Sequence, residues 1–225
     1  MKKKFWIIAG IVVVVLGIGF WLAMKSPTTM GIPTAPKPDA NIKGSQTLER
    51  SYSHMTGSPS AKVTLVEFGD YECPVCGEAS QPLNDIISKY KNNPNFNFVF
   101  RNFPLDSIHP YAEIAAEAAE AAGAQGKYFQ MHDALYTNQD EWTGSTDPVT
   151  DFVKYAQQIG LNMTQFKSDI NSYKYQNNVA QDLADGNAYG IDATPTFFLN
   201  GQKIVGVGSL NTFDSQIQAL LNNVK

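Results

Sequence analysis

The sequence predicts an α/β domain in which a strand–helix–strand unit is followed by an inserted helical section, then by a β-hairpin and a final helix. Three observations indicate this class. A β-branched apolar run at 63–68 leads into a Cys-x-x-Cys motif, helical spacing of apolar residues dominates the middle of the chain, and Asn200-Gly201 separates two strand-like runs near the end.

The first unit consists of two strands and the helix between them. The apolar run 63–68 is typical of a buried strand, and 76–90 carries apolar residues at helical spacing until Asn-Asn-Pro at 92–94 ends it. Phenylalanines alternate in the second predicted strand, 96–103. This order favours a parallel βαβ unit.

The helical section is expected at about 108–190. We interpret His109, which precedes Pro110, as a helix-start residue rather than a catalytic group. The aromatic and methionine side chains near Tyr128 are interpreted as packing core rather than as a cofactor pocket. The predicted helices cover 111–122, 127–136, 148–159, 163–170 and 173–189.

A hairpin and a helix complete the predicted domain. The strands are expected at 196–199 and 203–207, because the intervening Asn200-Gly201 pair supplies the two positive-φ residues of a type I′ turn. The segment 211–222 is amphipathic, with apolar residues at helical spacing. These two antiparallel strands would close the sheet.

Cys73 and Cys76 are the only cysteines in the 225 residues, and the Cys-Pro-Val-Cys sequence is typical of a redox-active dithiol. On the first turn of a helix, the two side chains would lie on one face, close enough to form a disulfide. Unpaired N–H groups and the helix dipole would stabilise a Cys73 thiolate. Cys73 is therefore the expected nucleophile, and the more buried Cys76 is the expected resolving thiol.

Two other uses of the Cys73–Cys76 motif stay open. A structural zinc site needs four ligands, and the three histidines of the chain are scattered, so we expect no metal and no other cofactor. A purely structural disulfide would close a very short loop and contribute little stability.

The N-terminal segment predicts a membrane anchor. Three lysines precede 20 uncharged residues at 5–24, which is long enough to span a bilayer. We predict an uncleaved signal anchor at 1–25, although a cleavable signal peptide stays open. Its orientation would place the dithiol on the extracytoplasmic side of the cell membrane, where disulfides persist, and the pattern is typical of bacterial proteins.

Composition predicts how the rest of the chain is organised. The proline-rich stretch 26–46 is predicted to be a flexible linker, and 47–225 is predicted to form one domain. Four of the 17 Lys and Arg residues lie in 1–25, which leaves 13 against 21 Asp and Glu and a net charge of −8. This acidity argues against nucleic acid or anionic lipid as a partner.

Three motifs resemble those of DsbA-like thiol-disulfide oxidoreductases in the thioredoxin superfamily. They are VEFGDYECPVC at 66–76, FRNFPL at 100–105 and GIDATPTFF at 190–198. The likeness extends from about Gly57 to the end of the chain. It implies a thioredoxin-like fold with an inserted helical subdomain.

The resemblance also implies roles for residues outside the two cysteines. Thr194-Pro195 matches a cis-proline loop that lies against the dithiol and pairs with substrate, with a trans proline opening a strand as the alternative. Glu67 matches a buried acid that moves the proton of the resolving thiol, unless it is an exposed strand-edge residue. Pro74 and Val75 would tune the redox poise.

The expected function is that of a membrane-anchored, extracytoplasmic thiol-disulfide oxidoreductase, acting as a monomer, that introduces disulfides into thiol-containing exported proteins. A membrane redox partner would reset the dithiol, and the resemblance suggests a quinone-linked protein. Two alternatives stay open: a reductase or isomerase with the same residues, and a non-catalytic, redox-responsive module that binds peptides near Pro195. Many family isomerases carry an added dimerisation domain, and we expect none in these 225 residues, which favours the oxidase.

Overall fold

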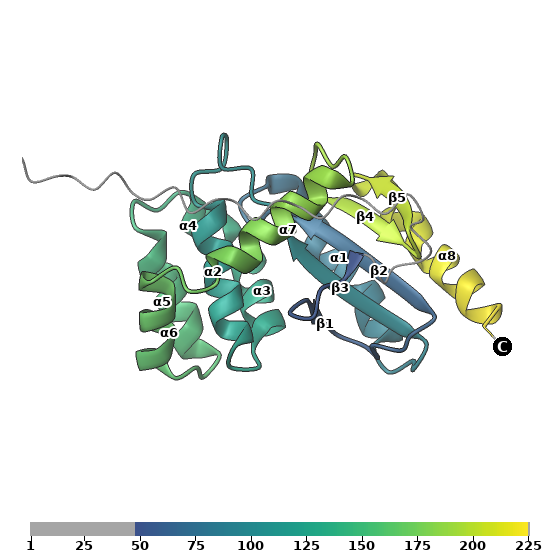
Figure 1. The fold of residues 1–225 in the computed structure, drawn as a ribbon, viewed down its shortest axis with the longest axis horizontal. Helices are drawn as coiled ribbons and strands as arrows, with labels where there is room; N and C mark the ends of the chain where they lie inside the picture. The colour runs from purple at the N-terminus through teal and green to yellow at the C-terminus, as the bar shows by residue number, and fades with distance from the viewer. Residues whose placement is uncertain (1–47, 225) are drawn as a thin grey trace, which may run out of the picture. The chain divides into compact units, whose positions relative to one another are not determined.

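The computed structural model describes residues 48–224 (Figure 1). The predicted signal anchor at 1–25 and linker at 26–46 lie outside the described residues. Between 48 and 224, no helix combines the length and the apolar character needed to cross a membrane.

Five strands in the described part of the chain form one sheet in the order β1-β3-β2-β4-β5. Neighbours β2 and β3 are parallel, and the other neighbouring pairs are antiparallel. Every residue of β2 and β3 is buried, because both strands are covered on their two faces. The strands are β1 (His54–Met55), β2 (Val63–Gly69), β3 (Phe96–Asn102), β4 (Thr196–Leu199) and β5 (Gln202–Val205).

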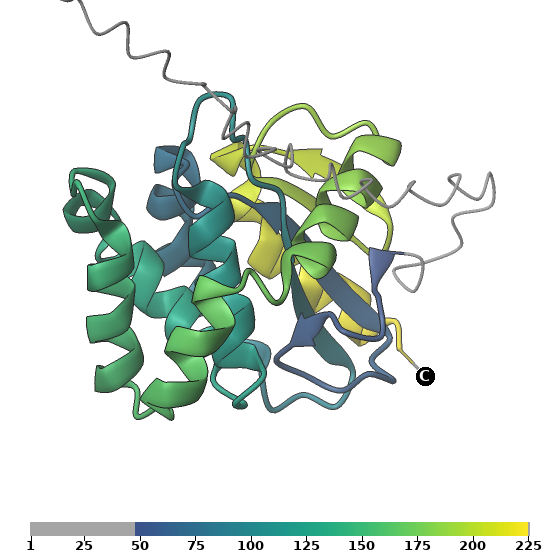
Figure 2. The ribbon, with the colours of Figure 1, turned by 60° about the vertical axis from the view of Figure 1, so that its left-hand side comes forward.

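The helices divide into those that cover the sheet and those of the insertion. Figure 1 shows α5 and α6 outermost, with α2 and α3 between them and the sheet, and Figure 2 shows this helical group turned toward the viewer. α7 returns the chain to the sheet and contacts β3. The helices are α1 (Pro74–Tyr90), α2 (Ala112–Gly123), α3 (Tyr128–Thr137), α4 (Gln139–Thr143), α5 (Pro148–Gln158), α6 (Met163–Asn171), α7 (Gln176–Ala188) and α8 (Leu210–Asn222).

Side chains from alternate positions of the central strands enter two separate cores. Leu65 and Phe197 join the core that includes buried residues of α1 and α8. Val66 and Phe198 face the opposite core, where Leu183 of α7 packs. The period-2 alternation of a strand therefore serves two apolar faces here, which explains the continuous apolar run at 63–68.

The pairing of β2 with β4 brings two distant parts of the chain together. Phe68, near the end of β2, lies opposite Thr196, the first residue of β4. The chain that follows β2 and the chain that precedes β4 therefore meet at the same end of the sheet.

Local signals predict most elements correctly. At the predicted hairpin turn, Asn200 has φ 48° and Gly201 has φ 84°, the positive values of a type I′ turn. The helix expected at 173–189 is wrong in its first turn, because Tyr173 has φ 48° and the helix begins at Gln176. β1 and α4 are elements that the sequence does not predict.

His109 does not start a helix, so that interpretation is wrong. α2 begins at Ala112 and its N-cap is Tyr111. The imidazole Nδ1 of His109 instead lies 2.6 Å from Oδ2 of Asp70, which is buried in the turn after β2. The aromatic and methionine positions of α3 do belong to the core, since Tyr128 and Met131 are buried.

Candidate active site

The two cysteines lie at the start of α1, directly after the turn that follows the central strand β2. Cys73 is the N-cap residue and Pro74 occupies the first turn, where its missing N–H costs nothing. The N–H of Cys73 donates to the Asp70 carbonyl at 3.1 Å. Both thiols are free, and Cys76 is fully buried whereas Cys73 retains 7% exposure. Of the two, only Cys73 is open to a partner.

The environment drives the two thiol pKa values apart. The pKa of Cys73 is lowered to about 5, first by a hydrogen bond from the Cys76 thiol, against the opposing effect of burial. Thr194 and the backbone N–H groups of Cys76 and Val75 lower it further. The pKa of Cys76 is raised well above its usual value, chiefly by burial. At neutral pH, Cys73 is the thiolate and Cys76 is the thiol.

The loop before β4 lies against Cys73. The Thr194–Pro195 peptide bond is cis, and the Cys73 Sγ lies 3.6 Å from the Thr194 carbonyl oxygen. The Thr194 hydroxyl is buried beside Cys73, and its side chain is one of the groups that lower the Cys73 pKa. The structure thus brings the predicted proline loop at Thr194–Pro195 next to the predicted nucleophile Cys73.

Glu67 lies beneath the dithiol in the middle of the sheet. Its register neighbours are Phe100 on β3 and Phe197 on β4, and its exposed fraction is 2%. The alternative of an exposed strand-edge residue is therefore wrong. Burial, and to a lesser extent the Cys73 charge, raise the pKa of Glu67 to about 8.

We expect Glu67→Gln to flatten the pH dependence of stability. Between the ordinary pKa of 4.5 and the folded value of about 8, the folded protein holds a proton that the unfolded chain has released. The contribution of Glu67 to the free energy of unfolding therefore falls as the pH rises through that window, by up to about 1.4 kcal/mol per pH unit. Urea unfolding of the reduced protein at about pH 5 and about pH 8 measures the slope. An unchanged difference in the variant would contradict the assignment.

Pro74 and Val75 form the surface between the cysteines. Val75 is 39% exposed, which is unusual for a large apolar residue in the described part of the chain. It lies two residues after Cys73 in the first turn of α1. The predicted effect of this dipeptide on redox poise stays a prediction.

Several side chains around the dithiol carry no signal in the sequence. Tyr136 donates through its hydroxyl to the Asp70 carbonyl at 3.3 Å, and Gln139 donates to the carbonyls of Tyr71 and Cys73. These contacts join residues more than 60 positions apart. Within residues 48–224, no group of three or more His, Cys, Asp or Glu side chains is arranged to hold a metal ion.

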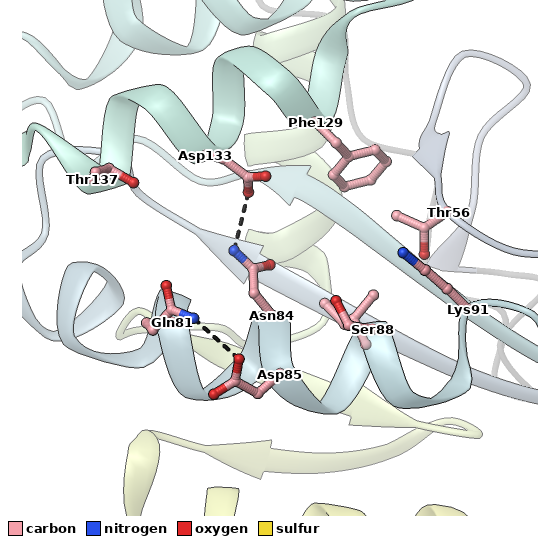
Figure 3. Close-up of a pocket in the computed structure, with 10 residues that line it drawn as sticks. Thr56, Gln81, Asn84, Asp85, Ser88, Lys91, Phe129, Asp133 and Thr137 are labelled. Carbon is pink, nitrogen blue, oxygen red and sulfur yellow. Dashed lines mark hydrogen bonds between the residues drawn. The ribbon is translucent and has the colours of Figure 1, made fainter.

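A separate pocket of about 540 Å³ lies between α1 and α3 (Figure 3). Asn84 donates to Asp133 at 3.1 Å within it, and Gln81 donates to Asp85 at the same distance. Neither cysteine lines the pocket, so it belongs to a different surface from the dithiol.

A dithiol at the start of the helix after a central strand, facing a cis-proline loop, defines a thiol-disulfide oxidoreductase with a thioredoxin-like fold. A thioredoxin family model matches residues 49–219. The chain therefore belongs to the thioredoxin family. The predicted α/β fold class of the domain is confirmed.

Solved structures share this fold. A thioredoxin-like oxidoreductase from Silicibacter pomeroyi DSS-3 superposes with a TM-score of 0.62 at 26% identity, covering 82% of this chain and 96% of that one. Wolbachia pipientis alpha-DsbA1 superposes with a TM-score of 0.67 at 24% identity, covering 77% and 93% of the two chains.

Curated relatives match over only part of their length. Na(+)/H(+) antiporter NhaA 1 of Salinispora arenicola (strain CNS-205) is 34% identical over 164 residues, which are 73% of this chain and 24% of the antiporter. The chain thus spans about a quarter of the length of the curated relatives it matches.

Proposed function

We propose that this protein is a membrane-anchored, extracytoplasmic oxidoreductase that introduces disulfides into exported proteins through Cys73 and Cys76. The observation that carries the direction is the low pKa of Cys73, about 5. A stabilised thiolate stabilises the reduced protein, and this makes the oxidised form the stronger oxidant. A thioredoxin-like reductant would need the opposite balance.

The reaction begins when a substrate thiolate attacks the Cys73 sulfur of the Cys73–Cys76 disulfide. A bond forms between the substrate sulfur and Cys73, and Cys76 leaves as a thiolate that takes a proton from Glu67. A second substrate thiolate then attacks the first substrate sulfur and expels Cys73 as a thiolate. The substrate is oxidised by two electrons, which the Cys73–Cys76 pair receives.

Substrate pairing is assigned to the loop at Thr194 and Pro195. This loop precedes β4 and lies beside Cys73, so an extended substrate segment could align along it while its sulfur meets Cys73. The partly exposed Val75 flanks the same place. We assign these residues to binding rather than to chemistry.

Anchoring and export form the second part of the proposal. They are supported by the uncharged segment 5–24 behind three lysines. A membrane redox partner that removes electrons from the reduced dithiol completes the cycle. Because the match to the antiporters covers about a quarter of their length, the ion transport in their name forms no part of this proposal.

The reduction potential tests the proposed direction. We expect the full-length protein, equilibrated with glutathione redox buffers, to have a potential near about −120 mV, the value of a strong disulfide donor. Trapping the dithiol with an alkylating reagent and measuring the mass ratio gives the equilibrium constant. A potential near about −270 mV would make the protein a reductant and overturn the oxidase direction.

A further inference from the structure

We propose that Gln139 is a positioning residue that sets the redox poise of the dithiol from the inserted helical subdomain. The proposal rests on the proposed redox role of Cys73 and Cys76. Gln139 is the first residue of α4, and its side chain reaches the turn between β2 and α1.

The Gln139 amide uses both of its hydrogens on the active-site turn. Its Nε2 donates to the Tyr71 carbonyl at 2.7 Å and to the Cys73 carbonyl at 2.9 Å. The residue is 8% exposed, so water competes poorly for these bonds. One side chain thereby fixes the backbone on both sides of Glu72.

A second side chain from the same junction contacts the same turn. Tyr136, near the end of α3, donates to the Asp70 carbonyl at 3.3 Å and is 6% exposed. Together, Tyr136 and Gln139 hold the carbonyls of Asp70, Tyr71 and Cys73. The backbone leading into the dithiol is therefore fixed by the helical subdomain.

The hydrogen bonds from Gln139 affect the Cys73 thiolate through the Cys73 backbone. The Cys73 carbonyl accepts the first hydrogen bond of α1, from Gly77 at 3.1 Å, in addition to the bond from Gln139. The N–H groups of Val75 and Cys76 that lower the Cys73 pKa belong to this same turn of helix. Freeing the carbonyl would loosen the alignment of those donors with the Cys73 sulfur.

The shape of α1 leaves room for the amide. A Cβ added at Gly77 would lie 2.3 Å from Oε1 of Gln139, too close for the two atoms to coexist. Gly77→Ala would therefore push the Gln139 amide away without changing Gln139 itself. Alanine is also the better helix former, so helix propensity would oppose any loss caused by this variant.

The experiment compares three single variants and one double variant of the full-length protein. Gln139→Ala removes the two bonds, and Gly77→Ala displaces them. Asn138→Ala is the matched control, because Asn138 makes an equivalent side-chain bond, at 2.7 Å, but to Ala134 within α3. The measurements are the Cys73 pKa, from the pH dependence of alkylation, the reduction potential in glutathione buffers, and the urea midpoint.

We expect Gln139→Ala and Gly77→Ala each to raise the Cys73 pKa by about one unit, a tenfold loss of thiolate stabilisation. The equilibrium constant with glutathione should shift about tenfold toward the oxidised protein, which corresponds to a potential about 30 mV more negative. Asn138→Ala should leave the Cys73 pKa and the reduction potential unchanged, even if it lowers the urea midpoint. The double variant Gly77→Ala/Gln139→Ala should match Gln139→Ala alone, because both changes remove the same contact.

Two results would contradict the positioning role of Gln139. A lower urea midpoint in Gln139→Ala with an unchanged Cys73 pKa and potential would reduce Gln139 to a structural role. If Gln139→Ala does not fold, an unshifted Gly77→Ala variant overturns the proposal by itself. A wild-type potential near about −270 mV would refute the oxidase function, yet the difference between Gln139→Ala and wild type would still test the positioning role.

Discussion

Replacing Arg101 by alanine is expected to lower the unfolding free energy by about 3–5 kcal/mol. Arg101 lies on β3 with no exposed surface, and its guanidinium contacts two buried carboxylates of α7. Nε donates to Asp182 at 2.7 Å and Nη2 donates to Asp185 at 2.6 Å, while Nη1 donates to the Leu48 carbonyl. Alanine would leave these carboxylates buried, with Arg50 as the remaining cation on Asp185.

The stability lost in Arg101→Ala should be smaller at lower pH. Burial already raises the pKa of Asp182, and Arg101 is the group that opposes this most strongly. Without Arg101, the folded-state pKa of Asp182 rises further above the unfolded value of 3.8, so the variant gains stability as pH falls toward that value. Urea midpoints at about pH 5 and about pH 8 should show a smaller deficit at the lower pH.

Lys89→Ala is the matched control for an ion pair at the surface. Lys89 contacts Asp214 at 2.6 Å, but the two side chains are 53% and 47% exposed. Solvent screens such a pair, so we expect little measurable change in the urea midpoint. If Arg101→Ala costs no more than Lys89→Ala, the buried network does not hold α7 to the sheet.

Cys73→Ser is expected to abolish thiol-disulfide exchange completely, and Cys76→Ser is expected to trap covalent mixed disulfides. The two thiols differ because Cys76 is fully buried and has a raised pKa, whereas Cys73 retains 7% exposure and has a pKa of about 5. Only Cys73 can therefore meet a substrate sulfur as a thiolate at neutral pH.

Alkylation and mass spectrometry separate these roles without knowledge of the natural substrate. At about pH 6, the Cys76→Ser variant should react rapidly through Cys73, and the Cys73→Ser variant should stay unmodified unless it is unfolded. Each variant is the control for the other. Equal reaction rates would contradict the assignment of nucleophile and resolving thiol, and a Cys76→Ser variant that traps no protein partner would count against exchange with exported proteins.

Elements whose signals are local are predictable from this sequence. The hairpin is one, because the backbone preference of Asn200 and Gly201 fixes the turn without help from the rest of the chain. β1 is different, since its two residues are defined only by pairing with Val99 and Phe100 of β3. No periodicity can exist in two residues. The five residues of α4 are similarly short for a helical pattern.

Some residues of the site are likewise predictable from the sequence, and others are not. Cys73 and Cys76 form a pattern that is visible in four consecutive letters, and the proline loop is recognisable by resemblance. The burial of Glu67 is not visible locally, because its own strand does not reveal that β3 and β4 lie on both sides. Gln139 is 66 residues from the Cys73 carbonyl that it contacts, and only the packing of the insertion on the turn brings them together.

The pairing of Phe68 with Thr196 has a consequence for how this protein can be altered. Cys73 follows Phe68 by five residues and Pro195 immediately precedes Thr196, so the gap between sulfur and proline depends on sheet register. If the pairing of β2 with β4 shifted by one residue, Thr196 would turn to the other face of the sheet and its side chain would leave its buried position. Substitutions in the loop at 190–193 that preserve this register are therefore expected to leave the distance between the Cys73 sulfur and Pro195 unchanged.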